Sequence, residues 1–464
     1  GVIGCAIDAD NGKMWWTNTS GTWFNSGNPA SGTNPQATFD SDWLNQTGGG
    51  GIPKYTVGTG TSSRFVANFG QDSSFAGNKT AQGNTDSNEI GDFYYTPPSG
   101  YLALCTANLP DPDVVPSENF NTVLWSGDSN TPRDITGVGF QPDFVWTKTR
   151  SSANDHSLFD AVRGASKRLC SNNTKEEFNP AAYGDVSAFL TDGFTVDNGT
   201  GGSLADEHIN ESGETYVAWN WKANGSGVSN TNGSITSTVS ANQDAGFSIV
   251  SYTGNATTGA TVGHGLSSAP EMVIIKHRQK TGQWQTYHHS INAPNAEDYF
   301  VMLNSTNASA VDGSASRWNN TDPSSTVVTF GNDWEVNDNG QNFIMYCFHS
   351  VDGFSKVGSY TGNGSSDGTF VYTGFRPAFF LIKNTDYANG WVMWDNKRDT
   401  SNPNDTNLFP FDSGAEATSS RPIDFLSNGI KIKTTDSATN TNGHTYIYIA
   451  FAEIPFSVGG GIAR

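Results

Sequence analysis

A pattern repeated three times, roughly every hundred residues, constrains the fold of this 464-residue chain more than any other feature. Each copy has a turn with a proline, followed by an apolar run that ends in lysine. The lysine lies six residues after the proline in every copy, and the pairs are Pro142 and Lys148, Pro270 and Lys276, and Pro377 and Lys383. A period of this length exceeds that of a solenoid repeat and predicts one small domain used three times.

The copies open and close on segments that are typical of β-strands. They open with Leu-Trp-Ser-Gly at 124–127 and with Ser-Tyr-Thr-Gly at 251–254 and 359–362. They close on aromatic-rich runs at 216–219, 343–346 and 446–449. Charged residues make up only 15 % of the chain, and long runs with helical periodicity are missing. We therefore predict an all-β fold of tandem β-sandwich domains, of the jelly-roll or lectin-like kind.

The first 105 residues carry a different set of elements. A strand of the form Ile-Gly-Xaa-Ala-Xaa-Asp begins at Ile3, and an aromatic strand at 13–16 completes a hairpin with it. An Asn-Phe-Gly-Gln strand at 68–71 and a closing Pro-Pro-Ser-Gly-Tyr at 97–101 follow. This order resembles the second half of a SPRY domain. The resemblance implies a partial sandwich, so we expect the missing strands to come from upstream residues or from a neighbouring chain. The chain also begins on a strand and without Met, and we expect it to continue a longer polypeptide.

Two linker-like segments separate the predicted domains. The first is rich in proline, and the second is rich in Asn, Ser and Gly and contains one short strand near 235–239. The expected ranges are 1–105 for the partial SPRY-like sandwich, 106–118 for the first linker, 119–222 for repeat 1, 223–245 for the second linker, 246–351 for repeat 2, 352–457 for repeat 3 and 458–464 for a tail.

The charge and the cysteines exclude several classes of function. Lys and Arg number 25 against 45 Asp and Glu, which gives a formal net charge of -20. Such a surface argues against binding to nucleic acid or to anionic membranes, and no apolar run is long enough for membrane insertion. The four cysteines have no spacing typical of zinc or redox sites, and we expect buried free thiols.

No pattern in the sequence points to catalysis, a metal or a cofactor. Asp8, Asp10 and Asn11 precede a glycine, but a tight hairpin turn explains them better than a calcium loop. Neighbouring residues of a strand face opposite ways, so His288 and His289 are expected at the surface. Glycoside hydrolysis needs a pair of acids, and those available do not recur between the copies. The available acids are Glu207, Glu214, Asp395 and Glu453. We therefore predict no catalytic residue, no metal site and no cofactor.

The repeated lysine and the aromatic residues are the remaining candidates. A lysine at the end of an apolar run predicts a strand that leaves the core, with the ammonium group in water. Flat aromatic rings suit the C–H faces of sugars, and the candidates for carbohydrate contact are Trp15, Trp16, Trp23, Trp284, Trp391 and Trp394. Trp391 and Trp394 should face opposite ways on their strand, so we expect at most one of them in the core. The loops after the lysine differ between copies, at 151–155, 279–285 and 384–390, and are where recognition is expected.

The whole chain resembles the large virion structural proteins of marine and cyanobacterial tailed phages. The resemblance rests on the SPRY-like segment, the proline linker, Gly-Phe-Arg-Pro at 374–377 and Ala-Phe-Ala-Glu at 450–453. It implies a non-enzymatic tail fibre or receptor-binding appendage at the surface of an extracellular virion, contacting a host-surface glycan. Other virion proteins are the implied partners, together with copies of the chain itself, by analogy in a trimer. The alternatives are a capsid decoration or spacer protein and a secreted polysaccharide-degrading enzyme.

Overall fold

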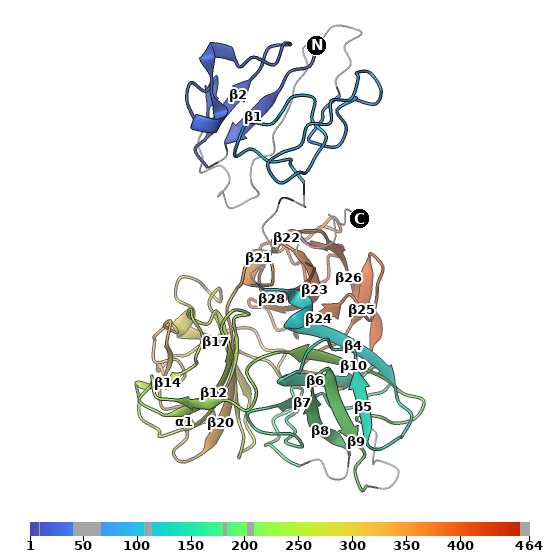
Figure 1. The fold of residues 1–464 in the computed structure, drawn as a ribbon. Coiled ribbons are helices and arrows are strands. Elements are labelled where there is room, and N and C mark those ends of the chain that lie inside the picture. The colour runs from blue at the N-terminus through green and yellow to red at the C-terminus, as the bar shows by residue number, and fades with distance from the viewer. Residues whose placement is uncertain are drawn as a thin grey trace. The chain divides into compact units, whose positions relative to one another are not determined.

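The computed structural model describes residues 1–8, 10–39, 66–105, 108, 114–179, 183–201 and 208–454. Its elements are nearly all antiparallel β-strands, which confirms the predicted all-β fold. The chain divides into two compact units, and Gly1–Asp111 and Pro112–Pro455 supply their main parts. The three repeats therefore lie together in the second unit (Figure 1).

The first unit contains a small sheet in the order β1-β2-β3, formed by β1 (Cys5–Asp8), β2 (Lys13–Trp16) and β3 (Ala37–Thr38), with short 3-10 helices at Phe24–Ser26 and Pro29–Ser31. The predicted hairpin is present, because Cys5 pairs with Trp16 in antiparallel register. The described part of the Asn-Phe-Gly-Gln segment is a bend and not the strand that we expected. The Asn68 carboxamide accepts hydrogen bonds from the backbone N–H groups of Gly70 and Gln71, at 2.8 and 2.9 Å, and this local turn replaces ladder bonds.

Repeats 1 and 3 are each made of two facing sheets. In repeat 1 the first sheet has the order β4 (Phe120–Ser126), β10 (Thr215–Trp221), β6 (Phe144–Thr149) and β7 (Ser157–Asp160), and the second has β5 (Arg133–Thr136), β9 (Gly193–Asp197) and β8 (Asp185–Leu190). In repeat 3 the first sheet has the order β21 (Ser355–Thr361), β28 (Thr445–Ile454), β23 (Arg376–Asn384) and β24 (Val392–Asp395), and the second has β22 (Phe370–Tyr372), β27 (Gly429–Ile432), β26 (Ala417–Leu426) and β25 (Asn404–Asn407).

Repeat 2 has a larger first sheet. Its order is β11 (Val228–Asn230), β12 (Ser237–Asn242), β13 (Phe247–Thr253), β20 (Asn342–Phe348), β15 (Met272–His277), β16 (Trp284–His288), β17 (Tyr299–Met302) and β18 (Ala310–Val311). Its second sheet pairs β14 (Ala260–Gly263) with β19 (Val327–Phe330), and α1 (Trp334–Asn337) follows. The segment 223–245, expected to be a linker, thus supplies two strands. Likewise, the end of the expected proline linker folds as a 3-10 helix at Pro116–Glu118, with Pro116 buried.

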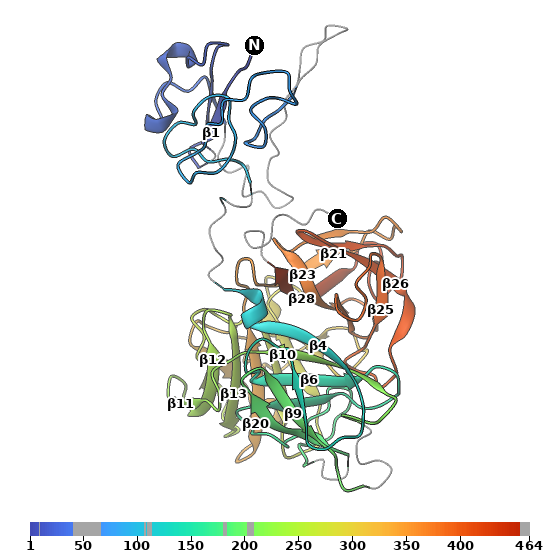
Figure 2. The same ribbon diagram turned by 45° about the vertical axis from the view of Figure 1, so that its right-hand side comes forward.

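The first sheets of the three repeats share one strand order. The sets β4-β10-β6-β7, β13-β20-β15-β16 and β21-β28-β23-β24 correspond strand by strand. The register corresponds too, because Phe144, Met272 and Phe379 pair with Asp160, His288 and Asp395 respectively. The sheets of repeats 1 and 2 lie next to each other in Figure 2, with the β4-β10-β6 set beside β12, β13 and β20. The repeats are thus three versions of one sandwich.

A single hydrophobic core joins the three repeats. It contains side chains from the first sheet of each one, such as Trp221, Phe348 and Phe451. At its centre Phe144, Met272 and Phe379, which hold equivalent positions, line a cavity of only about 20 Å³. Separate apolar clusters fill the interiors of the sandwiches of repeats 1 and 3. The first sheets therefore have both faces buried, which explains why every residue of β6, β15 and β24 is buried.

The repeated opening motif is part of the framework. The rings of Tyr252 and Phe343 stack with centroids 5.1 Å apart, and the Tyr252 hydroxyl donates a 2.6 Å hydrogen bond to the Val336 carbonyl. A Cβ atom at Gly254 would lie 2.4 Å from the Asp338 carbonyl oxygen, so only glycine fits there. The equivalent ring pairs are Trp125 with Tyr216 and Tyr360 with Tyr446. In each pair the first ring donates a hydrogen bond to a loop, which is the loop that contains Asn210 in repeat 1 and the loop that contains Asn440 in repeat 3.

Candidate functional site: the junctions between the repeats

The junctions where one repeat meets the next hold the densest buried polar chemistry of the second unit. We call them junctions 1–2, 2–3 and 3–1 after the repeats that they join. One backbone hydrogen bond occurs at the equivalent place in all three: Glu177 N–H donates to the Arg278 carbonyl at 2.8 Å, Ser309 N–H to Thr385 at 2.9 Å, and Glu416 N–H to Arg150 at 2.6 Å. The three junctions are therefore built on one plan.

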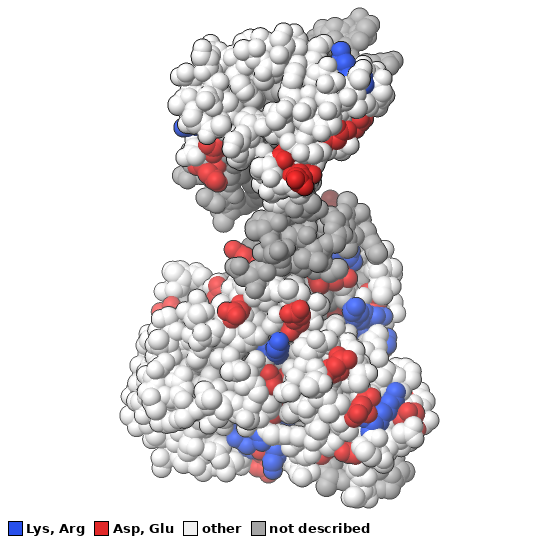
Figure 3. Space-filling view, in the orientation of Figure 1, with Lys and Arg blue, Asp and Glu red and all other residues white. Residues whose placement is uncertain are grey.

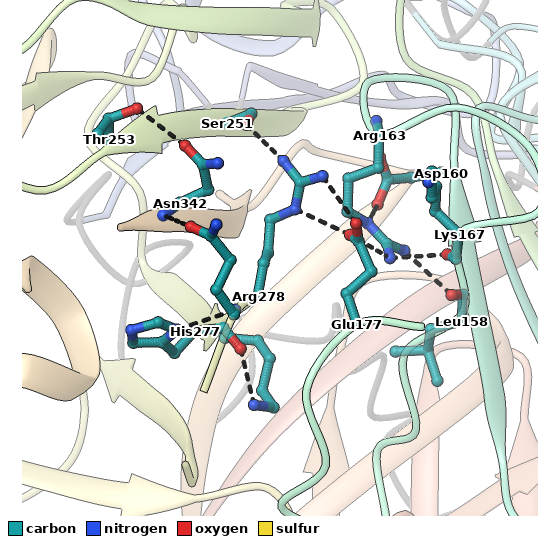
Figure 4. A network of polar contacts seen from close by, with 12 residues as sticks. Leu158, Asp160, Arg163, Lys167, Glu177, Ser251, Thr253, His277, Arg278 and Asn342 are labelled. Carbon is teal, nitrogen blue, oxygen red and sulfur yellow. Dashed lines mark hydrogen bonds and ion pairs between the residues drawn. The ribbon is translucent and has the colours of Figure 1, made fainter. Parts of the chain in front are cut away.

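A buried ion-pair network occupies junction 1–2 (Figure 4). Arg163 donates through Nε to Asp160 at 2.5 Å and through Nη1 to Glu177 at 3.3 Å, and the Arg163 and Asp160 side chains are fully buried. Across the junction, Arg278 donates to both oxygens of Glu177, at 2.8 and 2.9 Å. The Tyr346 hydroxyl of repeat 2 donates to Asp160 at 2.8 Å. Two carboxylates and two guanidinium groups thus neutralise each other inside the junction.

The same network recurs at junction 3–1 with different residues. Arg398 donates to Asp395 at 2.5 Å and to Glu416 at 3.1 Å, and both side chains of the Arg398–Asp395 pair are fully buried. Arg150 of repeat 1 donates to both oxygens of Glu416, at 2.9 and 2.8 Å. Trp219 Nε1 takes the place of the tyrosine hydroxyl and donates to Asp395 at 3.0 Å. The same arrangement thus occurs at equivalent positions in two of the three junctions.

Junction 2–3 lacks the whole network. His288 holds the register position of Asp160 and Asp395, and Ile291 stands where the other repeats have arginine, three residues later. The partner positions are Ser309 and Thr385 in place of Glu and Arg. Burial lowers the pKa of His288 to about 3, so this ring is neutral, and its Nε2 lies 3.2 Å from the Tyr448 carbonyl oxygen. Every charged member has been replaced by a neutral one, as expected where one unpaired buried charge would be costly.

At a second equivalent position in each junction, a ring nitrogen of one repeat lies within hydrogen-bond distance of a backbone carbonyl oxygen of the repeat before it. Trp284 Nε1 donates to the Cys170 carbonyl at 2.8 Å, and Trp391 Nε1 donates to the Met302 carbonyl at 3.0 Å. At junction 3–1, His156 Nε2 lies 3.1 Å from the Phe409 carbonyl oxygen. These rings attach each repeat to the backbone of the one before it.

The three repeated lysines do not reach water, contrary to the sequence prediction. Lys148, Lys276 and Lys383 are fully buried. Lys148 donates to the carbonyls of Thr149 and Ser152, and Lys276 donates to the His277 carbonyl at 2.8 Å. The physical reason is the central core, which covers the strand end that a free sandwich would expose.

Lys383 acts across junction 2–3. Its ammonium donates to the Asn389 carbonyl in its own loop and to the Thr306 carbonyl of repeat 2, at 3.3 Å. Burial lowers the pKa of Lys148 and Lys276 to about 8 and that of Lys383 to about 7. Acidic side chains partly offset this for Lys148 and Lys276, whereas burial is the cause at Lys383. Junction 2–3, which lacks the ion-pair network, therefore holds the lysine with the lowest pKa of the three.

These shifts predict that the second unit becomes more stable from pH 7 to pH 9. The folded chain releases lysine protons near pH 7 to 8, whereas the unfolded chain keeps them up to the ordinary pKa of 10.5. The unfolded state therefore binds more protons across this window, and the free energy of unfolding rises with pH. We expect a gain of about 2–5 kcal/mol, since one pKa unit corresponds to about 1.4 kcal/mol. Urea unfolding at a series of pH values measures it. Lys383→Met should reduce the slope, and a flat profile in the unchanged chain would contradict the prediction.

The structure buries four of the six tryptophans proposed for carbohydrate contact. Trp15, Trp284, Trp391 and Trp394 are 0 % exposed, so they cannot stack on an external sugar. Trp391 and Trp394 do face opposite ways, but both are buried because their sheet has a core on each side. Trp16 and Trp23 are half-buried, on extended segments joined by a bridge between Thr17 and Trp23. Carbohydrate contact through these two stays a prediction.

The other polar residues considered from the sequence are also placed. Asp395 belongs to the network of junction 3–1, Glu214 accepts from Ser151, and Glu453 pairs with Arg376 at 2.7 Å. Glu207 lies outside the described residues. His288 is buried, not at the surface, and Asp8 caps its own turn by accepting from Asn11 N–H at 3.0 Å. Cys170 and Cys347 are buried free thiols as expected, whereas Cys5 and Cys105 are exposed.

Within the described residues, neither a cluster of metal-binding side chains nor a helix that could span a membrane is found. Within them, no group of three or more His, Cys, Asp or Glu side chains is arranged to hold a metal ion. The helices seen there are too short and too polar to span a membrane.

The sequence analysis missed the networks, although one signal was present. Asp-Xaa-Xaa-Arg occurs at 160–163 and 395–398, at the same place in repeats 1 and 3. Glu177 and Glu416 follow their arginines at unequal distances, so they show no common spacing. The loops expected to serve recognition lie partly in the junctions, since Gly282 N–H donates to the Thr174 carbonyl of repeat 1.

The residues that match a known protein family agree with the bounds of the second unit. No curated protein and no solved structure is similar enough to this chain to count as a match. One family model, described as a domain of unknown function (DUF7483), matches residues 115–455. This match spans well over half of the chain and includes all three repeats together, as the shared core requires. The chain therefore belongs to the DUF7483 family, and one DUF7483 domain comprises the three sandwiches.

Proposed function

We propose that this chain is a non-enzymatic structural protein of a bacteriophage virion, and that it serves as a tail fibre or receptor-binding appendage. The observation that carries the proposal is the closed arrangement of three sandwiches on one core, with their buried charges paired across the junctions. The buried polar groups of such a unit hold it in one fixed shape. A rigid, pre-organised body is what display on a particle surface requires.

The distribution of charge on the surface supports a role that does not involve binding to nucleic acid. Figure 3 shows that Lys and Arg are interspersed with Asp and Glu on the face in view, and that most of that face is uncharged. Together with the net charge of -20, this favours partners recognised by neutral polar and aromatic contacts, such as host cell-surface polysaccharide. The half-buried Trp16 and Trp23 are the remaining candidates from the sequence for stacking on sugar rings.

Polysaccharide binding is tested with the full chain on an array of bacterial envelope glycans. We expect Trp16→Ala or Trp23→Ala to weaken binding roughly tenfold, about 1.4 kcal/mol, with no change in melting temperature. Trp334→Ala is the matched control, because this exposed tryptophan belongs to the second unit. If both variants bind as well as the unchanged chain, stacking by these residues is wrong.

A capsid decoration or spacer protein is the second candidate. The burial of four of the six proposed tryptophans favours it, because these rings serve the framework and not a ligand. Electron microscopy of the assembled particle separates the two: a position at a distal tip supports the appendage, and a position within a regular lattice supports the decoration protein.

A further inference from the structure

Strand β22 of repeat 3 is an edge strand, and no described strand pairs with its outer side. It pairs only with β27, and the bonds from Ile432 N–H to Thr369 and from Thr373 N–H to Asn428 fix which residues face β27. By the alternation of an antiparallel ladder, the backbone groups of Phe370 and Tyr372 point away from β27. Among the described residues, the N–H and C=O of Phe370 have no hydrogen-bond partner.

The equivalent edge in repeat 2 is covered by an extended segment of the same chain. Counting back from the repeated glycine, Thr261 of β14 corresponds to Phe370. Its carbonyl accepts from Ile235 N–H at 2.9 Å, and its N–H donates to the Ser234 hydroxyl at 2.8 Å. Ile235 forms a parallel bridge with Val262 and is almost fully buried. This edge of the sandwich can therefore accept a strand.

The equivalent edge in repeat 1 carries a charge. Asp134 of β5 holds the place of Phe370, and its carboxylate accepts from the Thr195 hydroxyl at 2.7 Å. Charged residues on an edge strand discourage pairing with other strands. Of the three equivalent edges, one is covered and one is charged.

The edge in repeat 3 has neither form of protection. Phe370 and Tyr372 are 42 % and 62 % exposed, while Val371 between them is buried in the sandwich. In repeat 2 a Cβ on Gly265 would lie 2.6 Å from the side chain of Val239 in β12, the strand that follows the covering segment, whereas a Cβ on the equivalent Gly374 would meet only the Tyr372 side chain, at 3.7 Å. Among the described residues, none pairs with the outer side of β22 or takes the place that Val239 has in repeat 2.

We propose that the edge of β22 binds an extended polypeptide strand from another protein, parallel to β22, in the way that residues 234–235 bind β14. The partner strand places a hydroxyl residue opposite the Phe370 N–H and an aliphatic residue next to it. Its own N–H donates to the Phe370 carbonyl, and its aliphatic side chain lies on the buried face of Val371, as Ile235 lies beside Val262. This is strand addition to a sheet edge, with backbone bonds giving affinity and the inward-facing aliphatic side chain giving preference.

The test uses the chain's own covering sequence as a probe. A synthetic peptide of residues 230–239, Asn-Thr-Asn-Gly-Ser-Ile-Thr-Ser-Thr-Val, is added to the full chain, and hydrogen exchange is followed by mass spectrometry. We expect saturable slowing of exchange at 369–373, and no effect from a scrambled peptide. Phe370→Pro removes the exposed ring together with an N–H that faces away from β27, so the β22–β27 ladder is kept, and it should weaken binding at least tenfold. Phe370→Asp places a carboxylate where repeat 1 has Asp134, and it should also weaken peptide binding at least tenfold.

An unchanged melting temperature of both variants shows that the sandwich is intact. Three results would each overturn the proposal: no slowing at millimolar peptide, slowing at β14 in place of β22, or equal binding by Phe370→Pro. Slowing at β22 by a soluble polysaccharide, with none by the peptide, would identify the surface as a glycan site and would also overturn it.

Discussion

Asp160→Ala is expected to lower the free energy of unfolding of the second unit by about 3–5 kcal/mol. The substitution removes the carboxylate that neutralises Arg163, a fully buried guanidinium group. It also leaves the Tyr346 hydroxyl without its acceptor across junction 1–2. An uncompensated buried charge is among the few causes of so large a loss from one substitution. Equilibrium unfolding in urea measures the change.

Junction 2–3 provides the matched control. Thr385 occupies the place of Arg278 but contributes no charge, so Thr385→Ala should change the free energy of unfolding by about 1 kcal/mol or less. Asp395→Ala at junction 3–1 should repeat the large effect, because its network is a copy of the first. If Asp160→Ala costs no more than Thr385→Ala, the network is not a stabilising feature of the junction.

Trp391→Ala is expected to cost about 3–5 kcal/mol, as large-to-small changes of buried aromatic residues do. The indole is fully buried in the shared core, and its removal leaves a cavity that three packed sheets can close only in part. The Met302 carbonyl of repeat 2 loses its donor as well. Thermal unfolding followed by circular dichroism measures the loss.

Trp334→Ala is the control here too, since this tryptophan is 44 % exposed and its loss should change stability by about 1 kcal/mol or less. A surface role for Trp391 predicts the reverse, namely lost polysaccharide binding at unchanged stability. That outcome would contradict the burial described above.

The main strands of the repeats could be predicted from the sequence because local patterns specify them, whereas their order in the sheets was not predicted. The proline-to-lysine spacing places β6, β15 and β23 in one register, and the aromatic runs mark the closing strands β10, β20 and β28. What the sequence did not show is that each first sheet is buried on both faces. A run such as 144–149 looks the same whether its second face meets water or another repeat. The predictions that Lys148 is solvated and that at most one of Trp391 and Trp394 lies in the core failed for that reason.

The junction networks depend on contacts that are distant in the sequence. Arg278 lies 101 residues from Glu177, and Arg150 lies 266 residues from Glu416. No local spacing joins such residues; only the packing of the repeats brings them together. The expected linker at 223–245 failed in a similar way, because its polar composition suits a solvent-exposed edge strand as well as a flexible connection.

We infer that the three repeats form one cooperative body around a shared core. Native-state hydrogen exchange of the full chain tests it most directly, through the amides of the closing strands β10, β20 and β28. The account predicts a common opening free energy in all three strands of the unchanged chain, and an equal loss in all three after Asp160→Ala. Lower protection in repeats 1 and 2 alone, with β28 unchanged, would show that repeat 3 opens separately and would contradict it.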